Sequence, residues 1–160
     1  MEFDLAFVLH SRPYTDSKAI VNLLTKEHGR ISGVVRVPKK KNSSREIQAF
    51  SLLNVGCHWK QGLKTLLSIE PEGIAFPLHG DALFCGMYLN ELLQRLLPED
   101  DACTSLFNLY QIALKNLQEM PGEREVLEPI LRSFELSMLA ELGYGVDFFE
   151  DSSGERITQG

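Results

Sequence analysis

The spacing of apolar residues along this chain changes near residue 77. Before that point the apolar residues form short runs, often β-branched, which turn residues interrupt. Runs of this kind are typical of β-strands. They are found at residues 5–9, 19–24, 31–37, 50–55 and 64–70. His28-Gly29 separates the second run from the third and predicts a hairpin, and Gln61-Gly62 predicts the turn between the last two.

Five short strands within about 75 residues are typical of a small barrel of the oligonucleotide/oligosaccharide-binding (OB) type. A five-stranded SH3-like barrel fits the same pattern equally well. The strand pattern alone therefore predicts a small β-barrel over residues 1–77 and leaves the type of barrel open.

After Pro77 the period becomes helical. Residues 81–97 are apolar nearly all round, which predicts a buried helix that ends before Pro98. A second helix is expected over residues 104–118. A third is expected from near Glu125 to Gly143, with Pro129 tolerated only in its first turn. The predicted fold class is α+β, with an all-helical domain over residues 78–160.

Charge is divided between the same two halves. Residues 1–64 hold eleven of the 16 Lys and Arg residues and five of the 22 acids, a formal charge of +6. Residues 65–160 carry −12, so the net charge of −6 hides the division. A basic front half joined to an acidic body indicates that the barrel binds a polyanion, although ordinary surface charge is the plainer explanation.

The densest basic stretch lies between Arg36 and Arg45, on what we expect to be a mobile loop at the mouth of the barrel. Lysines on such a loop contact phosphates without one fixed geometry, but a solvated loop would have the same composition. Aromatic residues are interleaved with the cations, and rings of this kind serve as stacking platforms in single-strand binders. Among them Phe50 is expected in the core, Tyr14 is a further ring, and Trp59 is the preferred stacking candidate. The predicted DNA-binding residues are Arg12, Lys18, Arg30, Arg36, Lys39, Lys40, Lys41, Arg45, Trp59, Lys60 and Lys64.

Patterns that would indicate catalysis are weak. Cys57 and His58 are neighbours on a predicted strand, so their side chains are expected on opposite faces. The three cysteines are widely spaced and belong to no Cys-x-x-Cys pair, which argues against zinc. The N-terminus lacks the features of a signal peptide, and no apolar run approaches the length of a membrane span. We therefore expect a cytoplasmic, non-enzymatic protein with reduced thiols, no metal and no cofactor.

Arg132 is a basic residue on an apolar helix in the acidic half. Pairing with Glu128 or Glu135, both within helical reach, is the plainer interpretation. The alternative is an apolar groove with a cation at its edge, which suits an acidic peptide or a terminal carboxylate. Leu131 and Phe134 are the expected apolar neighbours in that groove.

Several segments, taken together and in order, resemble the RecO family of bacterial DNA repair proteins. They are residues 6–14, 24–30, the lysine loop, 63–66, 88–93, 131–135 and, most specifically, 142–148. The resemblance covers nearly the whole chain. It implies an N-terminal OB barrel and a helical C-terminal domain.

The family resemblance also implies a recombination mediator that works without cofactor turnover and is associated with the nucleoid. It implies binding to single- and double-stranded DNA and annealing of complementary strands. It implies docking of the acidic C-terminal tail of single-stranded-DNA-binding protein, with Arg132 as the expected contact. It further implies cooperation with RecR in loading RecA.

The sequence departs from the family pattern at three places. Some members carry a four-cysteine zinc site after the Gly-Tyr motif. Residues 147–160 of this chain contain no cysteine, so we expect no zinc site here. The glycine usual in the basic loop is replaced around Val37-Pro38. Members also continue beyond the position of Gly160, so we expect this chain to be part of a longer protein.

Overall fold

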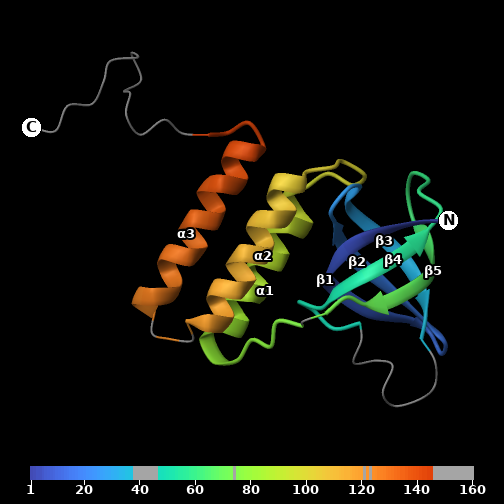
Figure 1. Cartoon of the computed structure of the whole chain (residues 1–160), viewed down its shortest axis with the longest axis horizontal. Helices are drawn as coiled ribbons and strands as arrows, with labels where there is room; N and C mark the ends of the chain where they lie inside the picture. Colours follow the sequence, from blue (N-terminus) through green and yellow to red (C-terminus); the bar gives the residue numbers. More distant parts are fainter. Residues whose placement is uncertain (38–46, 74, 121, 123, 146–160) are drawn as a thin grey trace, which may run out of the picture.

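In the computed structural model, a five-stranded barrel is followed by three helices (Figure 1). The structure describes residues 1–37, 47–73, 75–120, 122 and 124–145. The strands are β1 (Glu2–Thr15), β2 (Lys18–Thr25), β3 (Gly29–Arg36), β4 (Leu52–Cys57) and β5 (Lys64–Pro71). The helices are α1 (Gly80–Leu96), α2 (Thr104–Glu119) and α3 (Arg124–Glu141). The strands close in the order β1-β2-β3-β5-β4, with β3 and β5 parallel.

The predicted fold class is confirmed. The hairpin predicted from His28-Gly29 is also present, because β2 and β3 are antiparallel and Thr25 pairs with Gly29 at the turn. Two local predictions were wrong. The first strand is longer than the predicted run 5–9, because β1 continues to Thr15 and pairs with β2 from Ala6 onward. Pro129 is the sixth residue of α3 rather than part of its first turn, so one backbone hydrogen bond is missing from the second turn.

Residues 6–9 of β1 are buried on both faces of the strand, which explains the unbroken apolar run there. Ala6 and Val8 point into the barrel, whereas Phe7 and Leu9 point outward into the core formed with the helices. Successive side chains of a strand face opposite sides, so a strand with two covered faces needs apolar residues at every position. The barrel interior and the helical core therefore lie on opposite sides of this one strand.

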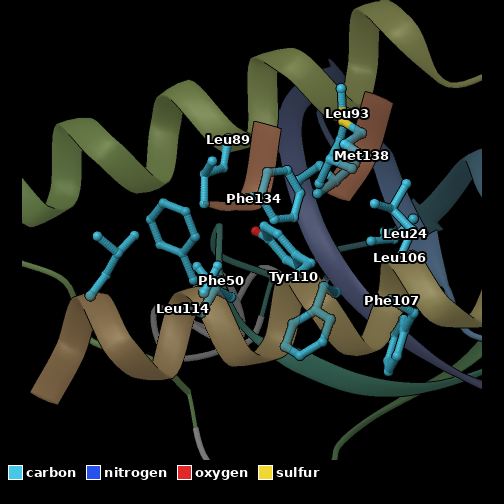
Figure 2. Close-up of a cluster of buried hydrophobic side chains, with 14 of the residues drawn as sticks. Leu24, Phe50, Leu89, Leu93, Leu106, Phe107, Tyr110, Leu114, Phe134 and Met138 are labelled. Atoms are coloured by element: carbon cyan, nitrogen blue, oxygen red, sulfur yellow. The ribbon is translucent and has the colours of Figure 1, made fainter. Parts of the chain in front are cut away.

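The helical core is built around aromatic and leucine side chains from all three helices (Figure 2). Tyr110 of α2 lies at its centre, with its ring 5.2 Å from that of Phe7 and 6.4 Å from that of Phe134. Leu24 and Phe50 of the barrel half belong to the same core, which confirms the core assignment of Phe50.

Helix α1 is less buried than its composition predicted. Five of its large apolar side chains are exposed by more than a third, the most exposed being Phe84 at 72%. They are Leu83, Phe84, Met87, Tyr88 and Leu96. Apolar residues nearly all round this helix thus do not mean that every face is covered within the described residues.

A polar junction joins α1, α2 and β1 at the centre of the molecule. Asn90 is almost fully buried, its Nδ2 donates to the carbonyl oxygen of Leu9 at 2.9 Å, and its Oδ1 accepts a hydrogen bond from the Tyr110 hydroxyl. The register of β1 against β2 shifts between Val8 and His10, so Leu9 is the extra residue of a β-bulge. Asn90 therefore satisfies a backbone carbonyl that the strand pairing leaves free.

We predict that Tyr110→Phe destabilises the protein although it keeps the ring in place. The substitution leaves the buried Asn90 Oδ1 without a donor, which costs about 1–3 kcal/mol in the free energy of unfolding. Urea denaturation would measure this loss as a lower midpoint at an unchanged slope. The matched control is Tyr144→Phe, at a tyrosine 73% exposed, which should change stability by about 0.5 kcal/mol or less. Equal midpoints for the two variants would contradict the prediction.

Candidate nucleic-acid interface

The outward face of the barrel carries a row of paired side chains across four strands. Arg12 of β1 lies opposite Ile20 of β2, Ile20 lies opposite Val34 of β3, and Val34 is the register partner of Thr65 of β5. Residues opposite one another in a ladder point to the same side of the sheet. The buried positions between them, such as Val35, face the interior instead. The row therefore forms one continuous surface.

A pair of cations lies beside this row. Lys18 at the start of β2 and Arg36 at the end of β3 are register partners, and both are exposed. Like charges directly opposite one another in an antiparallel pair are destabilising. Among the described residues neither side chain has an acidic partner within ion-pair distance. Together with Arg12, these two residues give a positive charge to the end of the barrel surface that is remote from the helices.

This surface is hollowed into a groove of about 540 Å³. The groove is lined by one aromatic ring, two cations and side chains of β3 and β5. These residues are Tyr14, Lys18, Val34, Arg36, Thr65, Leu66 and Leu67. The aromatic ring belongs to a residue at an irregularity of β1, where the register against β2 shifts between Pro13 and Thr15.

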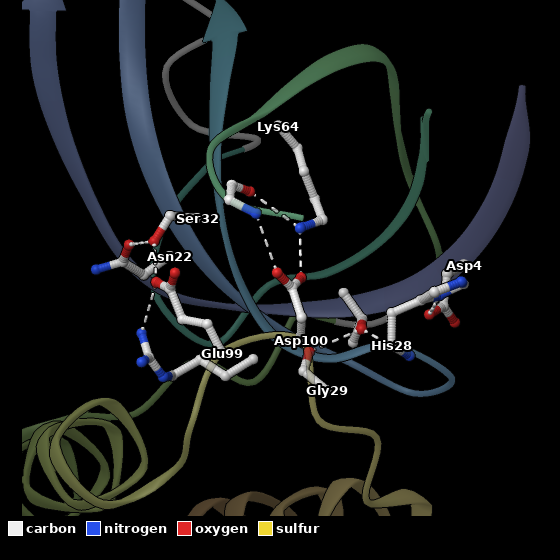
Figure 3. A network of polar contacts seen from close by, with 11 residues as sticks. Asp4, Asn22, His28, Gly29, Ser32, Lys64, Glu99 and Asp100 are labelled. Carbon is white, nitrogen blue, oxygen red and sulfur yellow. Dashed lines mark hydrogen bonds and ion pairs between the residues drawn. The ribbon is translucent and has the colours of Figure 1, made fainter. Parts of the chain in front are cut away.

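Two of the predicted DNA-binding cations are engaged elsewhere, by a loop between α1 and α2 (Figure 3). We call Glu99–Asp101 the acidic loop. Arg30 donates from Nε to the Leu97 carbonyl oxygen at 2.9 Å and from a guanidinium nitrogen to Glu99 Oε1 at 3.0 Å. Lys64 is only 5% exposed and its ammonium group is paired with the carboxylate of Asp100. These two cations link the barrel to the helical half.

Further hydrogen bonds hold the acidic loop against the barrel. Ser32 Oγ donates to Glu99 Oε1 at 2.7 Å, and the Gly62 amide donates to Asp100 Oδ2 at 3.2 Å. Gly29 has a φ of +73°, and a Cβ there would lie 1.8 Å from the Asp101 carbonyl oxygen. A glycine is required at that position both by the turn and by the close approach of the loop.

Trp59 is half-buried, and one face of its indole is already covered. The imidazole of His28 stacks on it at 3.8 Å with 4° between the planes. His28 Nδ1 in turn lies 2.9 Å from Asp4 Oδ2. Other parts of the indole pack against the barrel interior or line a cavity of about 210 Å³ together with Lys60 and the paired Lys64. Any base stacking on Trp59 would have to use the face away from His28.

The predicted lysine loop lies outside the described residues. This applies to Lys39, Lys40, Lys41 and Arg45, so their predicted role in DNA binding stays a prediction from the sequence.

Arg132 of α3 makes the local ion pairs that helical spacing allows. Its guanidinium lies 2.6 Å from Glu135 Oε2 and 3.8 Å from Glu128 Oε1. The hydrogen bond to Glu135 is the main reason that the pKa of Arg132 is raised. The Phe134 side chain is in the core, whereas Leu131 faces the groove between α1 and α3.

That groove has a volume of about 370 Å³ and combines apolar side chains with two guanidinium groups. It is lined by Asp81, Phe84, Cys85, Arg124, Leu127, Glu128, Leu131 and Arg132. The groove therefore offers apolar contacts beside two guanidinium groups, which Asp81 and Glu128 of the same lining offset in charge.

The thiol and imidazole of the Cys57-His58 pair do not form a nucleophile and base. Cys57 is fully buried and His58 is exposed, as expected for neighbours at the end of a strand. Burial raises the pKa of the Cys57 thiol, which disfavours the thiolate. In the part of the chain that the structure describes, no three His, Cys, Asp or Glu side chains gather in a way that could hold a metal ion. None of the described helices is long and apolar enough to cross a membrane.

Sequence reasoning missed the contribution of β5 to the positive groove and the neutralising role of the acidic loop. Thr65 and Leu67 are ordinary strand residues in the sequence. The run Glu99-Asp100-Asp101 was visible, but its pairing with Arg30 and Lys64 depends on how the two halves pack.

In comparisons with known proteins, each half of the chain matches a family model. The family model described as Recombination protein O N terminal matches residues 1–74, and the model described as Recombination protein O C terminal matches residues 78–160. A protein of Erwinia tasmaniensis named DNA repair protein RecO is 42% identical over 158 residues, which cover 97% of this chain and 63% of the relative. The protein of that name from Stutzerimonas stutzeri is 47% identical over 152 residues, covering 95% of this chain and 62% of the relative.

The DNA repair protein RecO of Pseudoalteromonas translucida is 37% identical over 160 residues, covering 99% of this chain and 68% of the relative. The chain thus spans a little under two thirds of the length of the first two relatives and slightly more of the third. With both terminal models matched in order, and with the barrel and helices that the resemblance implied, the chain belongs to the RecO family of recombination proteins.

Proposed function

We propose that this chain supplies the DNA-binding barrel and a partner-docking groove of a recombination mediator in DNA repair. In this proposal the barrel binds single- and double-stranded DNA and anneals complementary strands. The helical half docks the C-terminal tail of single-stranded-DNA-binding protein and acts with RecR in loading RecA. The alternative is a docking adaptor whose basic half is only solvated surface.

The observation that carries the proposal is the exposed cation surface of the barrel. Arg12, Lys18 and Arg36 share the outward face at the end remote from the acidic loop. The chain as a whole carries −6 and repels a polyanion at long range, but exposed charges act mainly within about 8–10 Å. A local group of cations therefore decides where phosphates bind.

The arrangement supports binding without sequence preference. Lys and Arg side chains on an open surface contact phosphates, and phosphate contacts carry no direct base information. Annealing requires a protein that holds strands of any sequence and leaves their bases free to pair. The free energy of such binding comes largely from counterion release, so its affinity falls steeply as salt rises.

We predict that the combined variant Arg12→Gln/Lys18→Gln/Arg36→Gln binds single-stranded DNA more weakly and with a flatter salt dependence. If each residue neutralises one phosphate, the slope of log K against log salt should fall in magnitude by about 2. Fluorescence anisotropy of a labelled oligonucleotide at several salt concentrations measures both quantities.

The matched control is Lys115→Gln, which removes an exposed cation of α2 on the helical half. It should leave the slope unchanged. A slope that stays the same in the triple variant would favour the adaptor, whose basic half contacts no DNA.

The partner part of the proposal rests on the groove between α1 and α3. Its apolar lining from Phe84, Leu127 and Leu131 suits apolar residues at the end of a peptide. Arg132 at the edge would bind the terminal carboxylate, for which the planar guanidinium is well suited. Its present pairing with Glu135 must be exchanged for the peptide carboxylate, so the net gain is smaller than for an unpaired arginine.

We predict that Arg132→Ala weakens binding of the acidic tail peptide about tenfold. The loss has two physical causes: a charge-assisted hydrogen bond is removed, and Glu128 and Glu135 are left to repel the peptide. Isothermal titration with the peptide measures the affinity, and circular dichroism checks the fold. Arg95→Ala is the matched control, because Arg95 forms a similar exposed pair with Glu91 on α1. Equal affinities for wild type and Arg132→Ala would place tail binding elsewhere.

A further inference from the structure

The groove over β2, β3 and β5 has the composition of a nucleotide site rather than of a phosphate site alone. Its lining combines the cations Lys18 and Arg36, the apolar side chains of Val34 and Leu66, and the ring of Tyr14. We propose that this groove takes one nucleotide of single-stranded DNA, with the base stacked on the Tyr14 ring and its phosphate between Lys18 and Arg36. The inference rests on the proposed DNA-binding function and assigns it a base-contacting residue.

Tyr14 is available for stacking in a way that Trp59 is not. Its side chain is 59% exposed, and no other aromatic ring of the described residues stacks on it. Trp59, in contrast, is covered on one face by His28. An exposed tyrosine ring offers an apolar face at little cost in conformational freedom, and base stacking on such rings tolerates any base.

The register of the sheet places an anion site next to that ring. Lys18 and Arg36 lie directly opposite one another, so their repulsion destabilises the free barrel and is relieved when an anion lies between them. Tyr14 lies in the segment of β1 that pairs with the beginning of β2. Its neighbour Pro13 pairs with Ala19, and its neighbour Thr15 pairs with Lys18. The ring and the two cations therefore line the same groove, as a base and its phosphate require.

The apolar part of the lining distinguishes a single strand from a duplex. Val34 and Leu67 gain nothing from a phosphate, but they bury the edge of a base or sugar. In a duplex the bases are already stacked inside the helix and reach the groove only if they are first unpaired, which opposes binding there. Tyr14 should therefore contribute to single-strand affinity and very little to duplex affinity.

The experiment compares Tyr14→Ala with wild type on three labelled ligands of equal length: a single strand, a duplex, and a single strand without bases. We expect Tyr14→Ala to lose about tenfold in affinity for the normal single strand. Its affinity for the duplex should change by less than about twofold. The abasic strand keeps every phosphate, so wild type and Tyr14→Ala should bind it equally, which isolates the base–ring contact.

Two further variants keep the result interpretable. Tyr14→Phe retains the ring face and should bind the single strand as wild type does. If Tyr14 acted only through its hydroxyl group, Tyr14→Phe would lose affinity as Tyr14→Ala does. Tyr144→Ala removes another exposed tyrosine, in the helical half, and should bind all three ligands as wild type does.

The outcomes separate this inference from the function on which it rests. If wild type binds none of the three ligands, the proposed DNA-binding function fails, and the nucleotide site fails with it. If wild type binds but Tyr14→Ala retains full single-strand affinity, only the site at Tyr14 is overturned. An equal loss on all three ligands would also overturn it, because the effect would then not involve a base.

Discussion

Residues 6–9 of strand β1 are buried on both faces of the strand, and the positions of the other elements depend on that burial. Its inward residues, such as Val8, complete the barrel, and its outward residues, such as Phe7, form part of the helical core. A bulge at Leu9 makes this possible at the cost of one unpaired carbonyl. Asn90 satisfies that carbonyl and is held by Tyr110, so a polar contact fixes where the helices sit on the barrel. Apolar packing alone would not specify this register, because it is not directional.

The packing of the two halves also decides which basic residues remain available to a ligand. The acidic loop packs against one end of the barrel and engages the outward-facing Arg30 and the buried Lys64 there. At the other end Lys18 and Arg36 face each other across two strands. A partly buried ion pair exchanges its acid for a phosphate only at a cost, whereas a repelling pair gains from one. The local arrangement of charge, rather than the net charge, therefore supports the position of the proposed nucleic-acid surface.

The sequence predicted the fold class well because hydrophobic period and turn residues are local signals. The five strands, the three helices and the core position of Phe50 all follow from such signals. The candidate site was predictable only in part. In the sequence Lys64 and Lys18 look alike, and they differ only because Asp100, far along the chain, packs against one of them. The pairing of Arg132 with Glu135 was foreseeable since both residues lie within one turn of a helix, whereas the stacking of His28 on Trp59 depends on the closed barrel.

The shared core has a consequence for how the molecule loses its structure. Phe7, Leu9, Leu24 and Phe50 belong to the barrel half of the sequence, yet they are buried against the helices. Burying four such side chains is worth roughly 6–12 kcal/mol before opposing terms, which is comparable with the whole stability of a domain of this size. Separating the barrel from the helices would forfeit most of this free energy. The two halves are therefore one cooperative unit in unfolding, although the family models divide them, and neither half is expected to persist after the other has melted.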